Sequence, residues 1–289
     1  MRKVTAAAVQ MSVPGTREQS VEKAAGLTKK AAEMGAKVVL LPELFETKYF
    51  CQERRYDSYK LALPTEEDPA VKLFSELTKE LSLVMPISFF ERDGNVLYNS
   101  AAMLDCGRLI GVYRKTHIPD DHFYQEKFYF TPGNTGFKVW DTSQGKIGVG
   151  ICWDQWFPEA ARCMALMGAE LLLYPTAIGS EPILDCDSSA HWRRCMQGHA
   201  AANLVPVIAA NRVGVEKILP DGENSFQKSE LKFYGRSFMT DETGGIKESA
   251  EQEEKILIKE YDLDEIADFR LSWGVFRDRR PEMYKKLVE

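Results

Sequence analysis

The sequence predicts an α/β sandwich built as one domain over residues 1–289. Short apolar runs rich in β-branched residues alternate along the chain with longer runs of helical spacing, the order typical of α/β proteins. No Pro/Gly/Ser-rich linker, internal repeat or low-complexity segment interrupts this alternation. The length is ordinary for a single α/β domain and allows a large buried core.

The first half of the chain begins with a predicted βαβ unit, in which two strand-like runs flank an amphipathic run that ends in a glycine stop signal. A second helix and a strand follow. Two further strand-like runs are joined at Cys106-Gly107, as in a hairpin. The expected elements are a strand at 4–11, a helix at 17–36, a strand at 37–43, a helix at 68–82, and strands at 83–91, 97–105 and 107–115.

The second half repeats the alternation of strands and helices. It closes with a turn-linked pair and with a strand that runs into a short helix. The expected elements are a strand at 146–152, a helix at 158–169, a strand at 169–175, a helix at 188–203, a strand at 205–211, the pair at 234–249, and the strand with its helix at 254–266.

Composition and charge narrow the class of function. Hydrophobic residues make up 44% of the chain and charged residues 28%, close to the values of soluble globular proteins, so neither disorder nor a membrane class is indicated. The net charge of −6 argues against a nucleic-acid binder, because such a protein needs a basic face. An acidic protein suits a cationic small molecule instead.

The chain is expected in the cytoplasm, because its N-terminus passes directly into a strand-like pattern without the apolar core and cleavage site of a secretory signal. The longest apolar runs, such as VVLLP and LLLYP, are far too short to span a bilayer, so no membrane partner is expected. Six cysteines without CxxC pairs, in a chain that needs no disulfides to hold its core, predict reduced thiols.

One cysteine, Cys152, stands at a position of chemical interest. In the segment GICWDQWFPE it follows an apolar run and precedes a helix start at Pro158-Glu159. Open α/β sheets bind ligands at the carboxyl ends of their strands, so this thiol is expected at the opening of a binding site rather than in the hydrophobic core. The other five cysteines are interpreted as ordinary small buried side chains: Cys51, Cys106, Cys163, Cys186 and Cys195.

A nucleophilic thiol needs a base or a nearby positive charge, since its ordinary pKa is about 8.5. None of the four histidines shows a recognisable partner motif. Two other strand ends offer a carboxylate, Glu43 in LLPELFE, and an ammonium, Lys115 in GVYRKTHIPD. Each alone is a weak signal, because most such residues are solvated. Together with Cys152 they provide a base, an electrostatic stabiliser and a nucleophile.

These segments resemble those of the nitrilase superfamily of carbon-nitrogen hydrolases, whose Glu-Lys-Cys triad lies in segments like PELFE, YRKTHIPD and GICWDQWFPE. The resemblance covers essentially the whole chain. It implies a four-layer α-β-β-α sandwich, hydrolysis of a carbon–nitrogen bond, and no metal or organic cofactor. It also implies a second active-site glutamate, Glu126 in YQEKFYF, and assembly as a homo-oligomer.

Longer blocks resemble the branch that hydrolyses N-carbamoylputrescine to putrescine, carbon dioxide and ammonia in polyamine synthesis. They include YNSAAM, YQEKFYFTPGNTGFKVW, HWRRCMQGHAAAN and WGVFRDRRPEMYK. By this resemblance Cys152 attacks the ureido carbonyl and Glu43 acts as the general base. Lys115 and the backbone N–H of Trp153 stabilise the oxyanion, and Glu126 holds Lys115 or the leaving amine.

Ureas are poor electrophiles, so orientation and a dry pocket must supply much of the rate. The aromatic residues near the thiol fit that need. Tyr124, Trp153 and Trp156 are expected to wall the pocket, whereas Phe157 is expected to pack in the core.

A protonated distal amine requires a carboxylate or an aromatic face at some distance from the carbonyl. The loop YPTAIGSEPILDCDSSAHW offers Glu181, Asp185 and Asp187 for this contact. The loop departs from the branch pattern at ILDCD. A second departure, Asp121-His122-Phe123, replaces a turn that contains proline and glycine, and a bulkier loop there narrows or reshapes the entrance.

Two alternative functions stay open at this point. The substrate could be another carbamoyl amine, a β-ureido acid or an ω-amide, and an acidic substrate would need an anion site at Arg194 or Arg212. The chain could also be a non-catalytic interaction protein on the same scaffold, although such proteins usually lack the nucleophile or the base. The C-terminal tail, about 272–289, combines aromatic and basic residues and is expected at a subunit interface.

Overall fold

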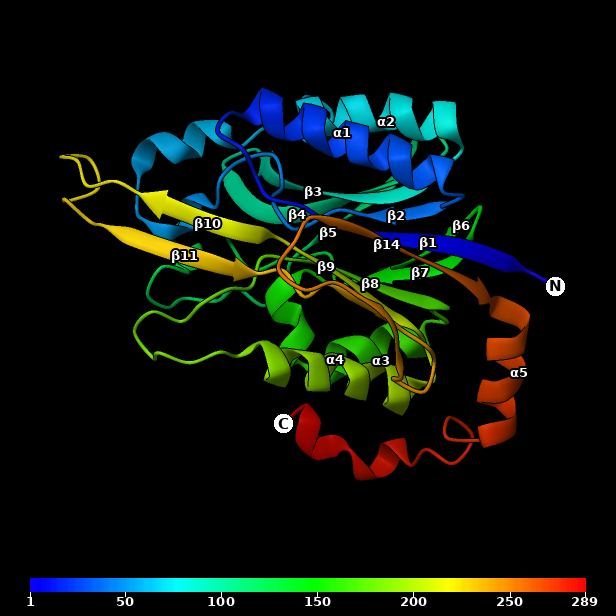
Figure 1. Cartoon of the computed structure of the whole chain (residues 1–289). Coiled ribbons are helices and arrows are strands. Elements are labelled where there is room, and N and C mark those ends of the chain that lie inside the picture. Colours follow the sequence, from blue (N-terminus) through cyan, green and yellow to red (C-terminus); the bar gives the residue numbers. More distant parts are fainter.

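The computed structural model describes residues 1–289 and contains two six-stranded sheets packed face to face (Figure 1). Helices α1 and α2 cover the outer face of one sheet, and α3 and α4 cover the outer face of the other. The order of layers is therefore α-β-β-α, as predicted. No helix is long and apolar enough to cross a membrane.

The first sheet has the order β14-β1-β2-β3-β4-β5, with parallel pairing among β1, β2 and β3 and antiparallel pairing elsewhere. Its last strand pairs with its first along the whole length, from Lys3 opposite Asp262 to Gln10 opposite Lys255. The elements of this half are β1 (Lys3–Gln10), α1 (Arg17–Glu33), β2 (Val38–Leu40), α2 (Pro69–Leu81), β3 (Val84–Asp93), β4 (Val96–Asp105), β5 (Arg108–Arg114) and β14 (Lys255–Asp262).

The second sheet has the order β13-β12-β9-β8-β7-β6, with β7, β8 and β9 parallel. Its elements are β6 (Val139–Thr142), β7 (Gly145–Val149), α3 (Pro158–Leu166), β8 (Leu171–Thr176), α4 (Ser189–Asn203), β9 (Val207–Asn211), β12 (Phe238–Thr240) and β13 (Ile246–Ser249). Outside the two sheets lie the ribbon of β10 (Val213–Ile218) and β11 (Ser229–Tyr234), and α5 (Leu263–Trp273). Short 3₁₀ turns are η1 (Phe50–Gln52), η2 (Tyr56–Leu61), η3 (Glu126–Phe128), η4 (Cys152–Trp156), η5 (Pro281–Met283) and η6 (Lys285–Leu287).

Local sequence signals explain where the outer helices begin and end. Thr16 and Gln19 form a capping box at the start of α1, and Gly35 adopts φ +97 just after its end, so the predicted glycine stop signal is confirmed. Asp68 accepts hydrogen bonds from the backbone of Ala70 and Val71 and caps α2.

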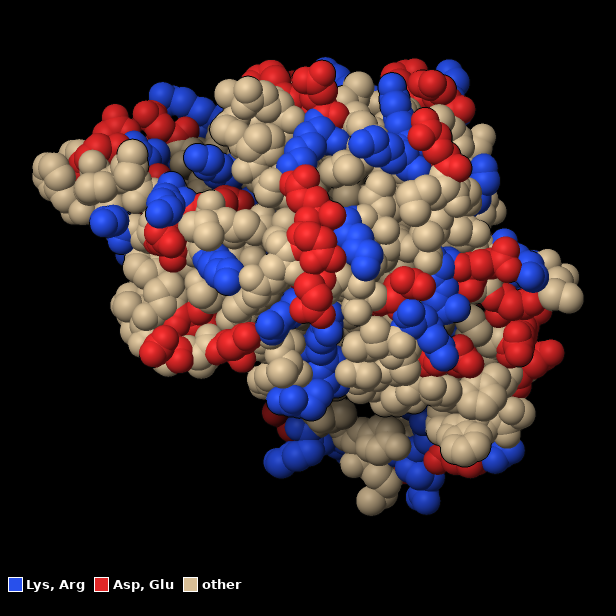
Figure 2. Space-filling view, viewed as in Figure 1, with Lys and Arg blue, Asp and Glu red and all other residues tan.

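Three apolar layers hold the sandwich together. The inner layer packs side chains of both sheets against each other, as Leu40 and Val149 illustrate. The outer layers pack α1 and α2 on the first sheet and α3 and α4 on the second. On the face drawn in Figure 2, basic and acidic side chains are interspersed.

Some elements differ from the sequence-based expectations. The ribbon of β10 and β11 and the short strand β6 were not expected, because their runs are polar or brief. The strand expected at 146–152 ends at Val149, and the chain turns into η4 at Cys152. The hairpin turn at Cys106-Gly107 is confirmed, with φ +47 and +89.

Candidate active site

Cys152 is the first residue of η4 and lies at a strained turn shortly after β7. Its backbone has φ +40, which is uncommon for a residue with a side chain and is one of the strained conformations that cluster at active sites. A Cβ at Gly150 would lie 2.7 Å from the ring of Tyr174, so only glycine lets the turn pass so close to β8. The thiol follows a strand end as predicted, but it is buried among the inner-layer residues rather than at an open mouth.

The turn is fixed by the buried carboxylate of Asp154. It accepts hydrogen bonds from the backbone N–H groups of Ile151 at 2.9 Å and His117 at 3.0 Å, and from the Tyr113 hydroxyl at 2.7 Å. The Nδ1 atom of His117 lies 2.7 Å from the same carboxylate. His117 also stacks on Phe157, with ring centroids 3.6 Å apart. Phe157 was expected in the core, but it is only partly buried, because it packs on this ring outside the sheets.

A lysine between two glutamates forms the second part of the site. The Lys115 ammonium follows β5 and donates to Glu43 at 2.8 Å and to Glu126 at 2.7 Å. All three side chains are buried. Glu43 follows β2, and its backbone N–H donates to the carbonyl of Thr176 in the other sheet at 3.3 Å. The cluster therefore lies between the two sheets.

The two carboxylates differ in their contacts. One oxygen of Glu43 accepts from Lys115 and, at 2.7 Å, from the side-chain amide of Asn99, while the other oxygen is buried without a hydrogen-bond partner. Both oxygens of Glu126 are occupied, one by Lys115 and the other by the Tyr49 hydroxyl at 2.7 Å. Glu43 is thus the carboxylate with a free acceptor.

Burial and charge set the protonation of this cluster. Burial disfavours the charged form of Lys115. The negative charges of Glu126 and Glu43 outweigh this effect and hold the pKa of the lysine well above its usual value. Burial raises the pKa of Glu126 to about 7 although Lys115 opposes the shift. Burial and then the Glu43 charge raise the pKa of the Cys152 thiol, and Lys115 again opposes this. The thiol is therefore neutral at rest and needs a base.

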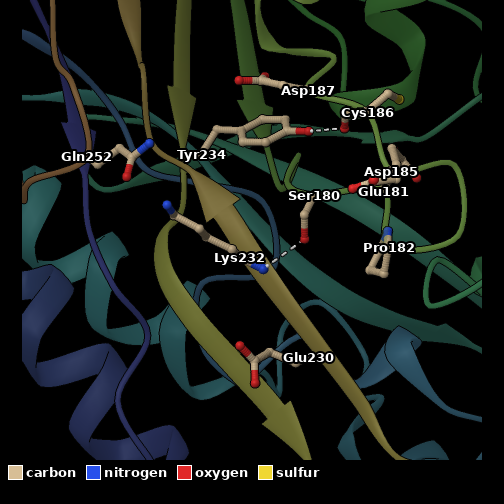
Figure 3. Close-up of a pocket in the computed structure, with 10 residues that line it drawn as sticks. All are labelled: Ser180, Glu181, Pro182, Asp185, Cys186, Asp187, Glu230, Lys232, Tyr234 and Gln252. Carbon is tan, nitrogen blue, oxygen red and sulfur yellow. Dashed lines mark hydrogen bonds between the residues drawn. The ribbon is translucent and has the colours of Figure 1, made fainter.

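A cavity of about 530 Å³ lies at the loop between β8 and α4, and none of the charged cluster's residues lines it (Figure 3). Its lining includes the predicted residues Glu181, Asp185 and Asp187, and it does not include Cys152. Tyr124 is close to residues of both places. Its hydroxyl donates to the carbonyl of Ser180 at 3.1 Å and accepts from the backbone N–H of Gly179 at 3.1 Å. Burial is the main cause that raises the pKa of the Tyr124 hydroxyl. The charges of Glu181 and Cys152 raise it further, so Tyr124 is near both groups.

The carboxylates of the cavity are not equivalent. Asp187 pairs with Arg236 at 3.1 Å and accepts from the backbone N–H of Ser189 at 2.9 Å, so its charge is already compensated. Glu181 has no such partner, and burial followed by the Asp121 charge raises its pKa to about 7. Asp185 also lacks an ion-pair partner, but it is exposed to solvent, whereas Glu181 is half-buried.

The two predicted tryptophans lie outside this cavity. Trp153 is 39% exposed and meets Trp156 edge to face, with ring centroids 6.2 Å apart. Trp156 in turn lies against His191 at 4.8 Å. Their contact with a substrate stays a prediction.

Two sequence-based interpretations are corrected by the structure. Arg212 was considered as an anion site, but it is fully buried and its guanidinium is occupied by three backbone carbonyls and Glu216. Of the cysteines expected to be buried, Cys163 and Cys186 are exposed, because one lies on the solvent side of α3 and the other in the loop before α4. All six cysteines are free thiols.

Two site residues were missed by sequence reasoning, and a third, Arg212, was considered for a different role. Asn99 and Tyr49 contact Glu43 and Glu126 directly, and Arg212 binds the backbone beside Glu43. Only Arg212 carried a signal, as a charge directly after the apolar run VPVIAAN. No group of three or more His, Cys, Asp or Glu side chains lies close enough together to hold a metal ion.

Comparison with known proteins gives one consistent result. Residues 5–271 match the family model described as carbon-nitrogen hydrolase. The chain is 51% identical to N-carbamoylputrescine amidase of Oryza sativa, over 99% of this chain and 95% of the relative. It is 50% identical to citrullinase of Francisella tularensis, over 100% and 99%. The crystal structure of a carbon-nitrogen hydrolase from Helicobacter pylori superposes with a TM-score of 0.90 at 39% identity, covering 99% of both chains.

Proposed function

This chain belongs to the carbon-nitrogen hydrolase family, and from that premise we propose that it hydrolyses an N-carbamoyl amine with Cys152 as nucleophile. The observation that supports this most is the unpartnered oxygen of Glu43, buried within a cluster whose charges act on the thiol. The chain is an enzyme of carbon–nitrogen bonds, which sets aside a non-catalytic role on the same scaffold. The experiment that tests the proposal is ammonia release from N-carbamoylputrescine.

In the first half-reaction Glu43 takes the proton of the Cys152 thiol while the sulfur attacks the ureido carbonyl. Negative charge grows on the carbonyl oxygen, where Lys115 and the backbone N–H of Trp153 stabilise it. The proton passes to the leaving nitrogen, and ammonia departs. The amine portion of the substrate remains bound to sulfur as a carbamoyl thioester.

In the second half-reaction Glu43 takes a proton from water, which attacks the thioester carbonyl. The thiolate leaves and is reprotonated. The product is a carbamic acid, which decomposes to carbon dioxide and the free amine. Glu126 fixes Lys115 throughout, because it accepts a second hydrogen bond from the ammonium that also donates to Glu43.

The proposed substrate is N-carbamoylputrescine, whose far end is an ammonium. Glu181 supplies an uncompensated carboxylate beyond Tyr124, and the relative from Oryza sativa carries this substrate in its name. The proposed product, putrescine, would make the reaction part of polyamine biosynthesis, and the proposed location is the cytoplasm.

Replacing Glu181 by glutamine is expected to raise KM for N-carbamoylputrescine about tenfold with little change in kcat, since a charge-assisted hydrogen bond contributes about 1.5–3 kcal/mol. KM should also depend on pH in the native enzyme. The pKa of the Glu181 carboxyl is about 7. The carboxyl is charged above that pH and binds the cation, whereas below it the carboxyl is protonated and affinity is lost. The measurement is KM for the cationic substrate relative to a neutral urea of equal length, from pH 6 to 8.

The matched control is Glu230→Gln, because Glu230 lines the same cavity but is paired with Lys217 at 2.8 Å. It should leave KM unchanged. A Glu181→Gln enzyme with native KM and a native pH profile would show that the amine is bound elsewhere.

A second candidate substrate is the ureido amino acid citrulline. The cavity also contains Lys232, which can meet a carboxylate, and the relative from Francisella tularensis is named citrullinase. The comparison of N-carbamoylputrescine, citrulline and N-carbamoyl-β-alanine therefore decides the substrate class. Preference for citrulline, lost in Lys232→Ala, would replace the cationic assignment.

We further propose that the chain is one domain that forms a homo-oligomer through its C-terminal tail, residues 272–289. Phe276 contacts Arg162 of α3, with 5.1 Å from the guanidinium to the ring centroid, while Trp273 and Leu287 are 64% and 66% exposed. Trp273→Glu combined with Leu287→Glu is expected to reduce the mass measured by light scattering at micromolar concentration. Leu73→Glu, at an exposed position of α2, is the control. A monomeric native protein would contradict the proposal.

A further inference from the structure

Arg212 is a buried arginine that no step of the mechanism uses. It follows β9 and lies beside the rings of Tyr49 and Phe233, with its guanidinium 5.8 and 5.6 Å from their centroids. Desolvating a guanidinium is costly unless every donor is used, so its contacts indicate what it is for.

The guanidinium binds the backbone that carries Glu43. Its Nε donates to the carbonyl of Glu43 at 3.1 Å, one terminal nitrogen donates to that of Leu44, and the other donates to that of Thr47 at 3.0 Å. Leu44 has φ +47, a conformation that disfavours a residue with a side chain. Neither Leu44 nor Glu43 lies in a strand, and Arg212 donates to the carbonyls of both.

A second branch runs from Arg212 to the other glutamate. The same guanidinium pairs with Glu216 at 2.9 Å, and the second oxygen of Glu216 accepts from the backbone N–H of Tyr49 at 2.6 Å. The Tyr49 hydroxyl donates to Glu126 at 2.7 Å. Both carboxylates that hold Lys115 are thus connected to one side chain.

We propose that Arg212 is a positioning residue that orients Glu43 and Glu126 around Lys115 and Cys152. It touches neither the thiol nor the cavity, so it acts only through the two carboxylates. The inference rests on the proposed roles of Glu43 and Cys152. A lysine at this position keeps the charge but lacks the planar fork, and one ammonium cannot reach acceptors at residues 43, 44, 47 and 216 together.

The first test is Arg212→Lys, with kcat and KM measured well below the melting temperature and corrected for the folded fraction. We expect kcat to fall about 100-fold with KM within about threefold of the native value, because small displacements of reacting groups cost this much. The matched control is Arg270→Lys. Arg270 also donates to backbone carbonyls, those of Leu204 at 3.0 Å and Ala169 at 3.4 Å, but it has no path to Glu43. The Arg270→Lys variant should be less stable than the native protein but have native kcat.

A second variant keeps the test decisive if Arg212→Lys does not fold. In Glu216→Gln the amide oxygen still accepts from Arg212, but the amide nitrogen cannot accept from Tyr49. This breaks only the branch to Glu126, and kcat should fall about tenfold. Native kcat in Arg212→Lys, or in Glu216→Gln when Arg212→Lys is unfolded, would overturn the inference.

Alkylation of Cys152 separates this inference from the proposed substrate. Iodoacetamide needs no substrate recognition, and mass spectrometry reports Cys152 and the exposed Cys163 in the same sample. In Arg212→Lys we expect Cys152 to react at least tenfold more slowly at pH 7 while Cys163 is unchanged. If the native enzyme hydrolyses no carbamoyl amine but this difference holds, the substrate proposal fails and the role of Arg212 stands. Equal alkylation rates would overturn the role of Arg212.

Discussion

Replacing Cys152 by alanine is expected to lower kcat for ammonia release by at least about 10⁴-fold, the scale seen when a catalytic nucleophile is removed. The reason is that every covalent step passes through this sulfur. The fold should persist, because the substitution removes one buried atom, and its strained backbone is held by Asp154 rather than by the thiol. The measurement is ammonia release from N-carbamoylputrescine, beside a thermal melt that verifies folding.

Cys163→Ala is the matched control, since Cys163 lies on the exposed side of α3 away from the charged cluster. It should retain native kcat. Turnover in Cys152→Ala that exceeds trace contamination by native enzyme would remove the thiol from the mechanism and leave Glu43 to activate water directly.

Replacing Lys115 by methionine is expected to cost about 3–5 kcal/mol of folding stability, because breaking a buried ion pair leaves a charge uncompensated. The cost is large here since two carboxylates, bound at 2.8 and 2.7 Å, lose the same partner. Activity should disappear as well, because the oxyanion loses its cation. Chemical denaturation and ammonia release provide the two measurements.

The double variant Lys115→Met/Glu126→Gln identifies the cause of this loss. With only Glu43 charged, the repulsion between the two carboxylates is gone, and part of the stability should return. Activity should not return. A double variant that is less stable than Lys115→Met would mean that the lysine stabilises the fold through its packing instead of its charge.

The sequence was most informative where local signals decide the structure. The outer helices begin at the cap residues Thr16 and Asp68, and α1 ends just before Gly35. The inner strands coincide with apolar runs of the sequence. The ribbon of β10 and β11 escaped prediction because polar residues interrupt both of its runs, although β11 buries alternate residues in the structure.

The candidate site divides in the same way. Glu43, Lys115 and Cys152 were identifiable because each follows an apolar run, and strand ends of one region converge in space. The role of Arg212 could not be identified from the sequence, because its acceptors are backbone carbonyls about 165 residues earlier in the chain. Likewise, the pairing of Asp187 with Arg236 depends on a contact that no local pattern encodes.

The pairing of β1 with β14 has a consequence for biosynthesis. Strand β1 leaves the ribosome long before residues 255–262 are made, and one of its edges stays unpaired until then. Long-range closure of this kind is slow, and an unpaired strand edge attracts other chains in the meantime. A nascent chain truncated before residue 255 therefore exposes the backbone of β1, and we expect such fragments to depend on chaperones or to aggregate.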